Sequence, residues 1–128
     1  MSGNQYDKNL VLEAAEAALR EGEAIAAAPL TIPATCNNGL CPTLPAGGTD
    51  RWLDTTFTAW RTAKSTNDKL VSSQFIIEDM GAQPVDGTCH FQTPIEPTCL
   101  IPLYRVTARA TATNGRGTTV TLQSNIRQ

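Results

Sequence analysis

The chain has 128 residues, enough for one hydrophobic core and too few for two comfortable ones, and 41% of them are hydrophobic. Its formal net charge of −2 argues against a general binder of nucleic acid or of anionic membranes. No apolar run approaches the ~20 residues that a membrane-spanning helix needs. We therefore expect a single folded domain over residues 1–128.

An alanine-rich helix is predicted first, within residues 1–28. The segment consists almost wholly of strong helix formers, and Pro29 ends it. Asp7 or Asn9 is the expected N-terminal cap. Its apolar residues recur at helical spacing over a wide arc, which indicates packing on more than one side and leaves open which side faces inward. The predicted packing positions are Leu12, Ala14, Ala17, Ala18, Leu19, Gly22 and Ile25.

Residues 29–69 contain prolines and glycines throughout and are expected to form an irregular connection. The four cysteines fall into two local pairs in loop-like settings, Cys36/Cys41 and Cys89/Cys99. Three connectivities are possible, and the spacings do not resemble those of a zinc site. We expect two nearest-neighbour disulfides, each worth roughly 2–3 kcal/mol and formed in an oxidising compartment. Because no export signal opens the sequence, we expect it to be the exported part of a longer protein.

An antiparallel sheet is predicted within residues 70–126. Residues 70–80 favour a first strand, and residues 104–113 and 120–126 alternate strictly between apolar and polar side chains around a glycine-containing turn. This alternation predicts a hairpin with one buried and one wet face. The expected fold class is α+β, with one long helix packed on about 3–4 antiparallel strands and with disulfide-stapled loops.

No catalytic, metal or cofactor site is expected. His90 is the only histidine and lies next to a cysteine, so it is more typical of a surface residue than of a general base. Glu78 and Asp79 are neighbours on a strand and therefore point to opposite faces, which argues against a carboxylate dyad. The aspartates lack the spacing of an EF-hand loop. The chain is accordingly predicted not to be an enzyme.

Several stretches, in order along the chain, resemble the minor pilins of type IV pili of the PilX type. They are residues 1–9 (MSGNQYDKN), 14–23 (AAEAALREGE), 38–42 (NGLCP), 75–78 (FIIE), 104–109 (YRVTAR), 115–117 (GRG) and 120–124 (VTLQS). The helical stretch alone would be a weak signal, and its combination with the terminal hairpin is more specific. The resemblance implies a pilin-like fold whose membrane helix and leader peptide have no counterpart in this sequence.

The same resemblance implies a role without bond-making chemistry. A minor pilin of this type helps to prime a type IV pilus and is incorporated at its tip, in contact with other minor pilins and an adhesin-like protein. It would be anchored in the inner membrane with a periplasmic domain and later be part of the extracellular pilus. Twitching motility and cell adhesion would depend on it, and the helix would pack on its own sheet and on neighbouring subunits.

Two alternatives remain at this point. The first is a pilin that binds DNA or another ligand, for which Arg105, Arg109 and Arg116 form the candidate polar patch. Three arginines on an acidic domain are thin support, because phosphate binding depends on several cationic contacts. The second is a free secreted binding module in which the helix packs only within its own domain.

Overall fold

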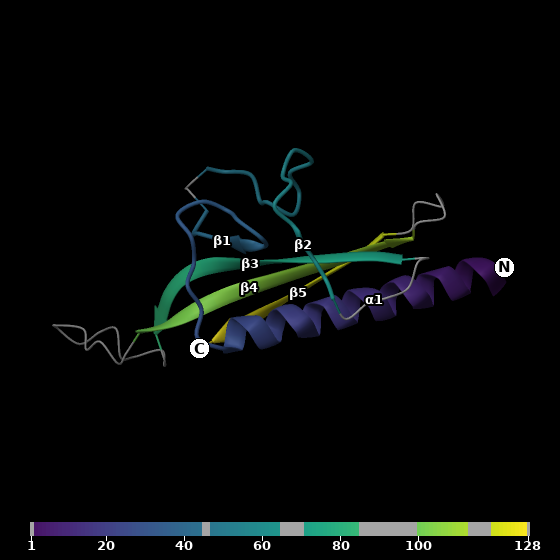
Figure 1. The fold of residues 1–128 in the computed structure, drawn as a ribbon, viewed down its shortest axis with the longest axis horizontal. Coiled ribbons are helices and arrows are strands. Elements are labelled where there is room, and N and C mark those ends of the chain that lie inside the picture. Colours follow the sequence, from purple (N-terminus) through teal and green to yellow (C-terminus); the bar gives the residue numbers. More distant parts are fainter. Residues whose placement is uncertain (1, 45–46, 65–70, 85–99, 113–118, 128) are drawn as a thin grey trace.

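The computed structural model describes residues 2–44, 47–64, 71–84, 100–112 and 119–127. Within these ranges, side chains are described for residues 9–82 and 100–127. One helix lies along a long, twisted sheet (Figure 1). The elements in chain order are α1 (Ser2–Ala27), β1 (Leu40–Cys41), β2 (Arg61–Thr62), β3 (Val71–Pro84), β4 (Leu100–Ala112) and β5 (Thr119–Arg127).

The helix expected within residues 1–28 is α1, which extends from Ser2 to Ala27. At 1.5 Å per residue its length is about 39 Å, so it lies along nearly the whole sheet. It already passes through Asp7 and Asn9, so neither residue caps it as expected. The residues before Asp7 include the weak helix formers Ser2, Gly3 and Asn4, so helix propensity does not account for this earlier start.

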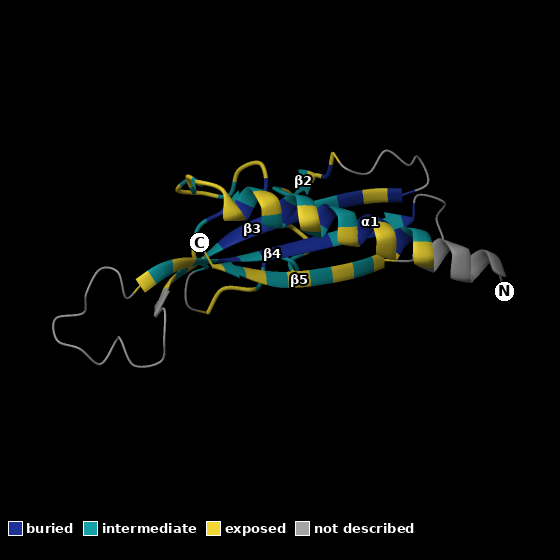
Figure 2. Ribbon diagram, turned by 90° about the horizontal axis from the view of Figure 1, so that it is seen from below, coloured by how far each residue is buried: buried dark blue, intermediate teal, exposed yellow. Residues whose placement is uncertain are grey.

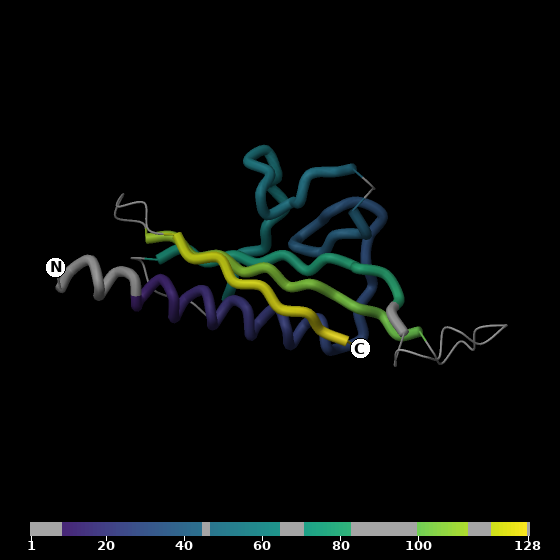
Figure 3. The backbone as a smooth tube through the Cα atoms, turned by 180° about the vertical axis from the view of Figure 1, so that it is seen from behind, coloured from purple at the N-terminus to yellow at the C-terminus, as the bar shows by residue number. Residues whose placement is uncertain are grey.

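The sheet is mixed, which corrects the expectation of a purely antiparallel one. Its strands follow the order β1-β3-β4-β5, and β2 also pairs with β3. The antiparallel pairs include the predicted terminal hairpin, in which Ala108 of β4 lies opposite Leu122 of β5 (Figure 3). The short strand β1 instead runs parallel to β3, with Leu40 opposite Ile77. Both short strands come from the segment expected to be irregular, so five strands form the sheet in the described part of the chain, where about three or four were expected.

The helix covers one face of β3, β4 and β5, and the main core lies between them (Figure 2). Phe75 and Ile77 of β3 and Val106 and Ala108 of β4 are fully buried there. They pack against small side chains of α1, including Ala18. Small residues on the helix let its backbone approach the sheet closely, which compensates for the chain's low aromatic content of 5%.

The opposite face of the sheet, called here the outer face, is covered over β3 and β4 by residues 30–44 and 47–64 (Figure 1). Ile76, Glu78 and Thr107 lie on this face and are 0–1% exposed. The prediction of a wet face on the hairpin is therefore wrong for the middle of β4. It is right for β5, whose residues alternate between exposed and half-buried. Period-2 patterning reports only that two faces differ, and it does not reveal a loop that folds back over the polar one.

Candidate interaction surfaces

The packing positions predicted on the helix are divided between the inside and the outside of the domain. Ala14, Ala18 and Gly22 are buried against the helix's own sheet. Leu12 is 39% exposed. The remaining positions, Ala17, Leu19 and Ile25, are half-buried along the margins. Contact of these positions with other subunits stays a prediction, and the buried ones have no surface left to offer.

The side of α1 that faces away from the sheet is called here the open face. It consists of six exposed residues at helical spacing, Leu12, Glu13, Glu16, Arg20, Ala24 and Ala27 (Figure 2). Residues three and four apart share one side of a helix, so these six form a continuous stripe. The alanines at the C-terminal end of the stripe leave the backbone accessible to another helix, and the charged residues lie nearer its centre.

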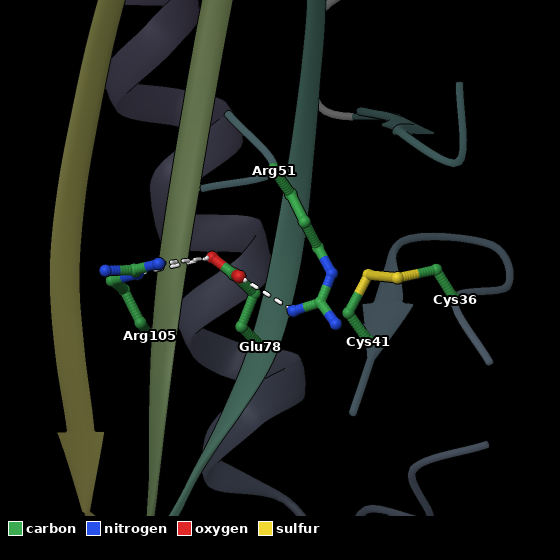
Figure 4. The surroundings of a disulfide bond; sticks show 5 residues. All are labelled: Cys36, Cys41, Arg51, Glu78 and Arg105. Atoms are coloured by element: carbon green, nitrogen blue, oxygen red, sulfur yellow. Dashed lines mark hydrogen bonds and ion pairs between the residues drawn. A yellow bond between two sulfur atoms is a disulfide. The ribbon is translucent and has the colours of Figure 1, made fainter. Parts of the chain in front are cut away.

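A buried carboxylate on β3 joins the outer face of the sheet to the segment that covers it. Glu78 is 1% exposed and accepts a hydrogen bond from Arg51 Nη1 at 2.9 Å. Arg105 of β4 donates to the other carboxylate oxygen from Nε at 3.2 Å and from Nη2 at 3.0 Å (Figure 4). Asp50 lies 3.8 Å from Arg105 Nη2 and is more exposed. Each oxygen of the buried carboxylate therefore has a cationic partner.

This cluster connects three parts of the chain that are distant in sequence. Glu78 and Arg105 are opposite each other on β3 and β4, whereas Arg51 comes from the covering segment. A buried ion needs its partners, because an unpaired charge in a low-dielectric interior is costly. The covering segment is therefore fixed to the sheet by charge as well as by apolar contact. Sequence reasoning missed this role, since nothing around Glu78 signals that a distant loop will bury it.

The predicted disulfide between Cys36 and Cys41 is present beside this cluster (Figure 4). Between the two cysteines, Asn38 and Gly39 both adopt positive φ angles of 49° and 80°. Asn37 and Leu40 exchange backbone hydrogen bonds of 2.9 and 3.0 Å around them. This is the geometry of a two-residue type I′ turn, which favours Asn-Gly. Cys89 and Cys99 lie outside the described residues, so their pairing stays a prediction.

The backbone of Gly39 attaches this turn to the sheet. Its carbonyl accepts a 2.7 Å hydrogen bond from Ile77 N–H, and its N–H donates to the Ala59 carbonyl at 2.8 Å. A Cβ at Gly39 would lie 2.5 Å from Arg61 Cβ. The disulfide loop is thus closely held between β3 and the segment before β2, and only glycine fits there without displacement.

Replacing both cysteines of this loop, in Cys36→Ala/Cys41→Ala, should destabilise the chain by about 2 kcal/mol. The reason is the extra conformational freedom that the unfolded chain gains when a short loop is no longer closed. Urea unfolding of the oxidised protein, followed by tryptophan fluorescence, measures the change. Equal stability of the variant and the parent would show that the turn is held by its hydrogen bonds alone.

The predicted arginine patch is engaged within the domain at both of its described positions. Arg105 belongs to the Glu78 cluster. The Arg109 guanidinium lies 4.0 Å from the centre of the Trp60 ring and donates to Gln74 Oε1 at 3.0 Å. Burial lowers the pKa of Arg109 from its usual value. Arg116 lies outside the described residues, so the patch as a whole is not tested.

In the described parts of the chain, no group of three or more histidine, cysteine, aspartate or glutamate residues could hold a metal ion. Within the same ranges, no helix combines the length and apolar character required to cross a bilayer.

Comparison with known protein families identifies one match. Residues 31–128 match the family model described as "Type IV pilus assembly protein PilX C-term", which covers more than half of the chain. The matched residues include the disulfide loop, the covering segment and strands β1 to β5, and they do not include α1. No curated protein and no solved structure matches the chain.

Proposed function

The chain belongs to the PilX family of type IV pilus assembly proteins, and on this basis we propose that it is a minor pilin that helps to prime the pilus and is incorporated at its tip. The family itself implies a periplasmic or pilus location. The proposed partners are other minor pilins and an adhesin-like tip protein. The proposed contribution is structural, through surface contacts, and pilus-dependent adhesion and twitching motility follow from it.

The observation that supports this proposal is that α1 is buried along one side and exposed along the other. Its inner side is buried against the sheet through Ala14, Ala18 and Gly22, and its open face is a continuous stripe without any covering element among the described residues. Ala24 and Ala27 on this stripe permit close approach of another helix, because small side chains keep backbones near each other. A helix of about 39 Å that is covered along one side only is suited to lie against neighbouring subunits.

The DNA-binding alternative gains no support from the described residues. Arg105 is paired with a buried glutamate, and Arg109 is stacked on Trp60. A guanidinium that already neutralises a carboxylate adds little to the binding of phosphate groups. We therefore do not adopt nucleic acid as the proposed partner.

Substitution of the open face tests the proposal in cells that carry the native pilin. Ala24→Trp places a bulky ring where another helix is proposed to approach. The amount of surface pili should therefore decrease at least several-fold. The isolated 128-residue chain should keep its melting temperature, because Ala24 is exposed and makes no core contact. Sheared pili are quantified by immunoblot, and thermal unfolding is followed by circular dichroism.

Thr121→Trp is the matched control, since Thr121 is also exposed but lies on β5, on the outer face of the sheet. This variant should assemble pili at the parental level. Normal piliation of the Ala24→Trp variant would contradict the proposed contact. An equal loss for both variants would assign the defect to surface bulk in general rather than to the open face.

A further inference from the structure

The last strand of the sheet has an unpaired edge. β5 ends the strand order and pairs only with β4 among the described residues (Figure 2). In an antiparallel strand, every second residue directs its backbone N–H and C=O away from the existing partner. The nine residues of β5 therefore present a row of unused hydrogen-bonding groups.

In the described part of the chain, β5 itself lacks the sequence features and the bulges by which proteins often prevent strand addition. From Thr119 to Ile126 the sequence is TVTLQSNI, with no proline, glycine or charged residue. The strand is regular throughout its pairing with β4, without a bulge. The other edge of the sheet is different, because β1 and β2 pair with β3 there. The β5 edge is thus free of short added strands, whereas β3, at the other side of the sheet, pairs with β1 and β2.

We propose that β5 pairs edge to edge with β5 of a second copy of this chain, antiparallel and centred on Gln123. The sequence of the strand is complementary to itself in this register. Val120 meets Ile126, Thr121 meets Asn125, and Leu122 meets Ser124. Gln123 lies opposite Gln123 of the second copy. Arg127, the only charged residue of the strand, lies opposite Thr119. No like charges face each other, and the apolar pair is of the type that stabilises neighbouring strands.

The half-buried side chains of β5 support the same arrangement. Val120, Leu122 and Ile126 lie on the helix side of the sheet and pack only in part against the core. A symmetric partner would place its own Ile126, Ser124 and Val120 beside them and remove more of this apolar surface from water. The two helices would lie on the same side of one continuous sheet. This inference does not depend on the proposed function, since it concerns the isolated chain.

Cysteine cross-linking tests the register directly. In Gln123→Cys the two new cysteines would be directly opposite each other, so mild oxidation should yield a covalent dimer on a non-reducing gel. Thr121→Cys is the matched control on the same strand and the same face. Its two cysteines would be four residues apart along the paired strands, about 13 Å, which is too far for a disulfide. We expect several-fold more dimer for Gln123→Cys.

Sedimentation velocity over a range of protein concentrations tests the association without a cross-link. The parent chain should shift from monomer to dimer as its concentration rises. Gln123→Lys should remain monomeric, because two ammonium groups would face each other at the centre, whereas Gln123→Thr should still associate. Circular dichroism verifies that each variant is folded. A parent chain that stays monomeric, or equal cross-linking of the two cysteine variants, would overturn the proposal.

Discussion

Glu78→Gln is expected to reduce the free energy of unfolding by about 3–5 kcal/mol, the range measured when one partner of a buried ion pair is removed. The amide keeps the shape of the carboxylate but leaves the Arg51 guanidinium without its counter-charge, and leaves Arg105 with only the more distant Asp50. The side chain of Arg51 is 10% exposed and that of Arg105 is 20% exposed, so water replaces the lost partner poorly. Urea unfolding at neutral pH measures the difference.

Asp50→Asn provides the control within the same cluster. Asp50 lies 3.8 Å from Arg105 and its side chain is 42% exposed, so its loss should cost less than about 1 kcal/mol. Similar losses for the two variants would show that Glu78 acts by charge at a distance rather than as a buried partner.

A second expectation concerns how readily the covering segment opens away from the sheet. Because Glu78 ties the covering segment to the sheet, its substitution should also increase proteolysis between residues 30 and 64.

Gly22→Leu is expected to destabilise the chain by on the order of 3 kcal/mol, and Gly22→Ala by about 1–2 kcal/mol. A Cβ at Gly22 would lie 2.6 Å from Val106 Cγ1 and 3.1 Å from Phe75 Cδ2. Both neighbours are fully buried, and Val106 is stiff because it is β-branched. The strain therefore exceeds the gain in helix propensity of about 1 kcal/mol that replacing glycine by alanine brings. Thermal and urea unfolding measure the series.

A double substitution separates the close contact from other effects of Gly22. In a Val106→Ala background the clashing methyl group is absent, so Gly22→Ala should become nearly neutral or stabilising. Ala24→Leu, on the open face of the same helix, should change stability by no more than about 0.5 kcal/mol. An unchanged cost of Gly22→Ala in the Val106→Ala background would contradict the proposed role of this contact.

The secondary structure of this protein is largely a local property of its sequence. The helix follows from a run of alanine, glutamate and leucine that ends at Pro29, and α1 ends at Ala27. The terminal hairpin follows from strict alternation, and its two strands pair with Ala108 opposite Leu122. The Cys36–Cys41 disulfide follows from two cysteines that flank Asn-Gly in a short loop. Each of these signals lies within a few residues of the structure that it predicts.

The candidate site depended instead on contacts between distant segments. Arg51 and Glu78 are 27 residues apart, as are Glu78 and Arg105, and no local pattern connects them. The residues around Glu78 did not indicate which face of the strand would be buried, and Glu78 is an interior residue because residues 30–44 and 47–64 lie over its face of the sheet. The buried side of the helix could not be predicted from the sequence either, because its apolar arc was too wide to reveal which side the sheet would cover. Sequence by itself determined the elements, because propensity and periodicity act locally, while the tertiary structure decided which charges are buried and which helix face stays open.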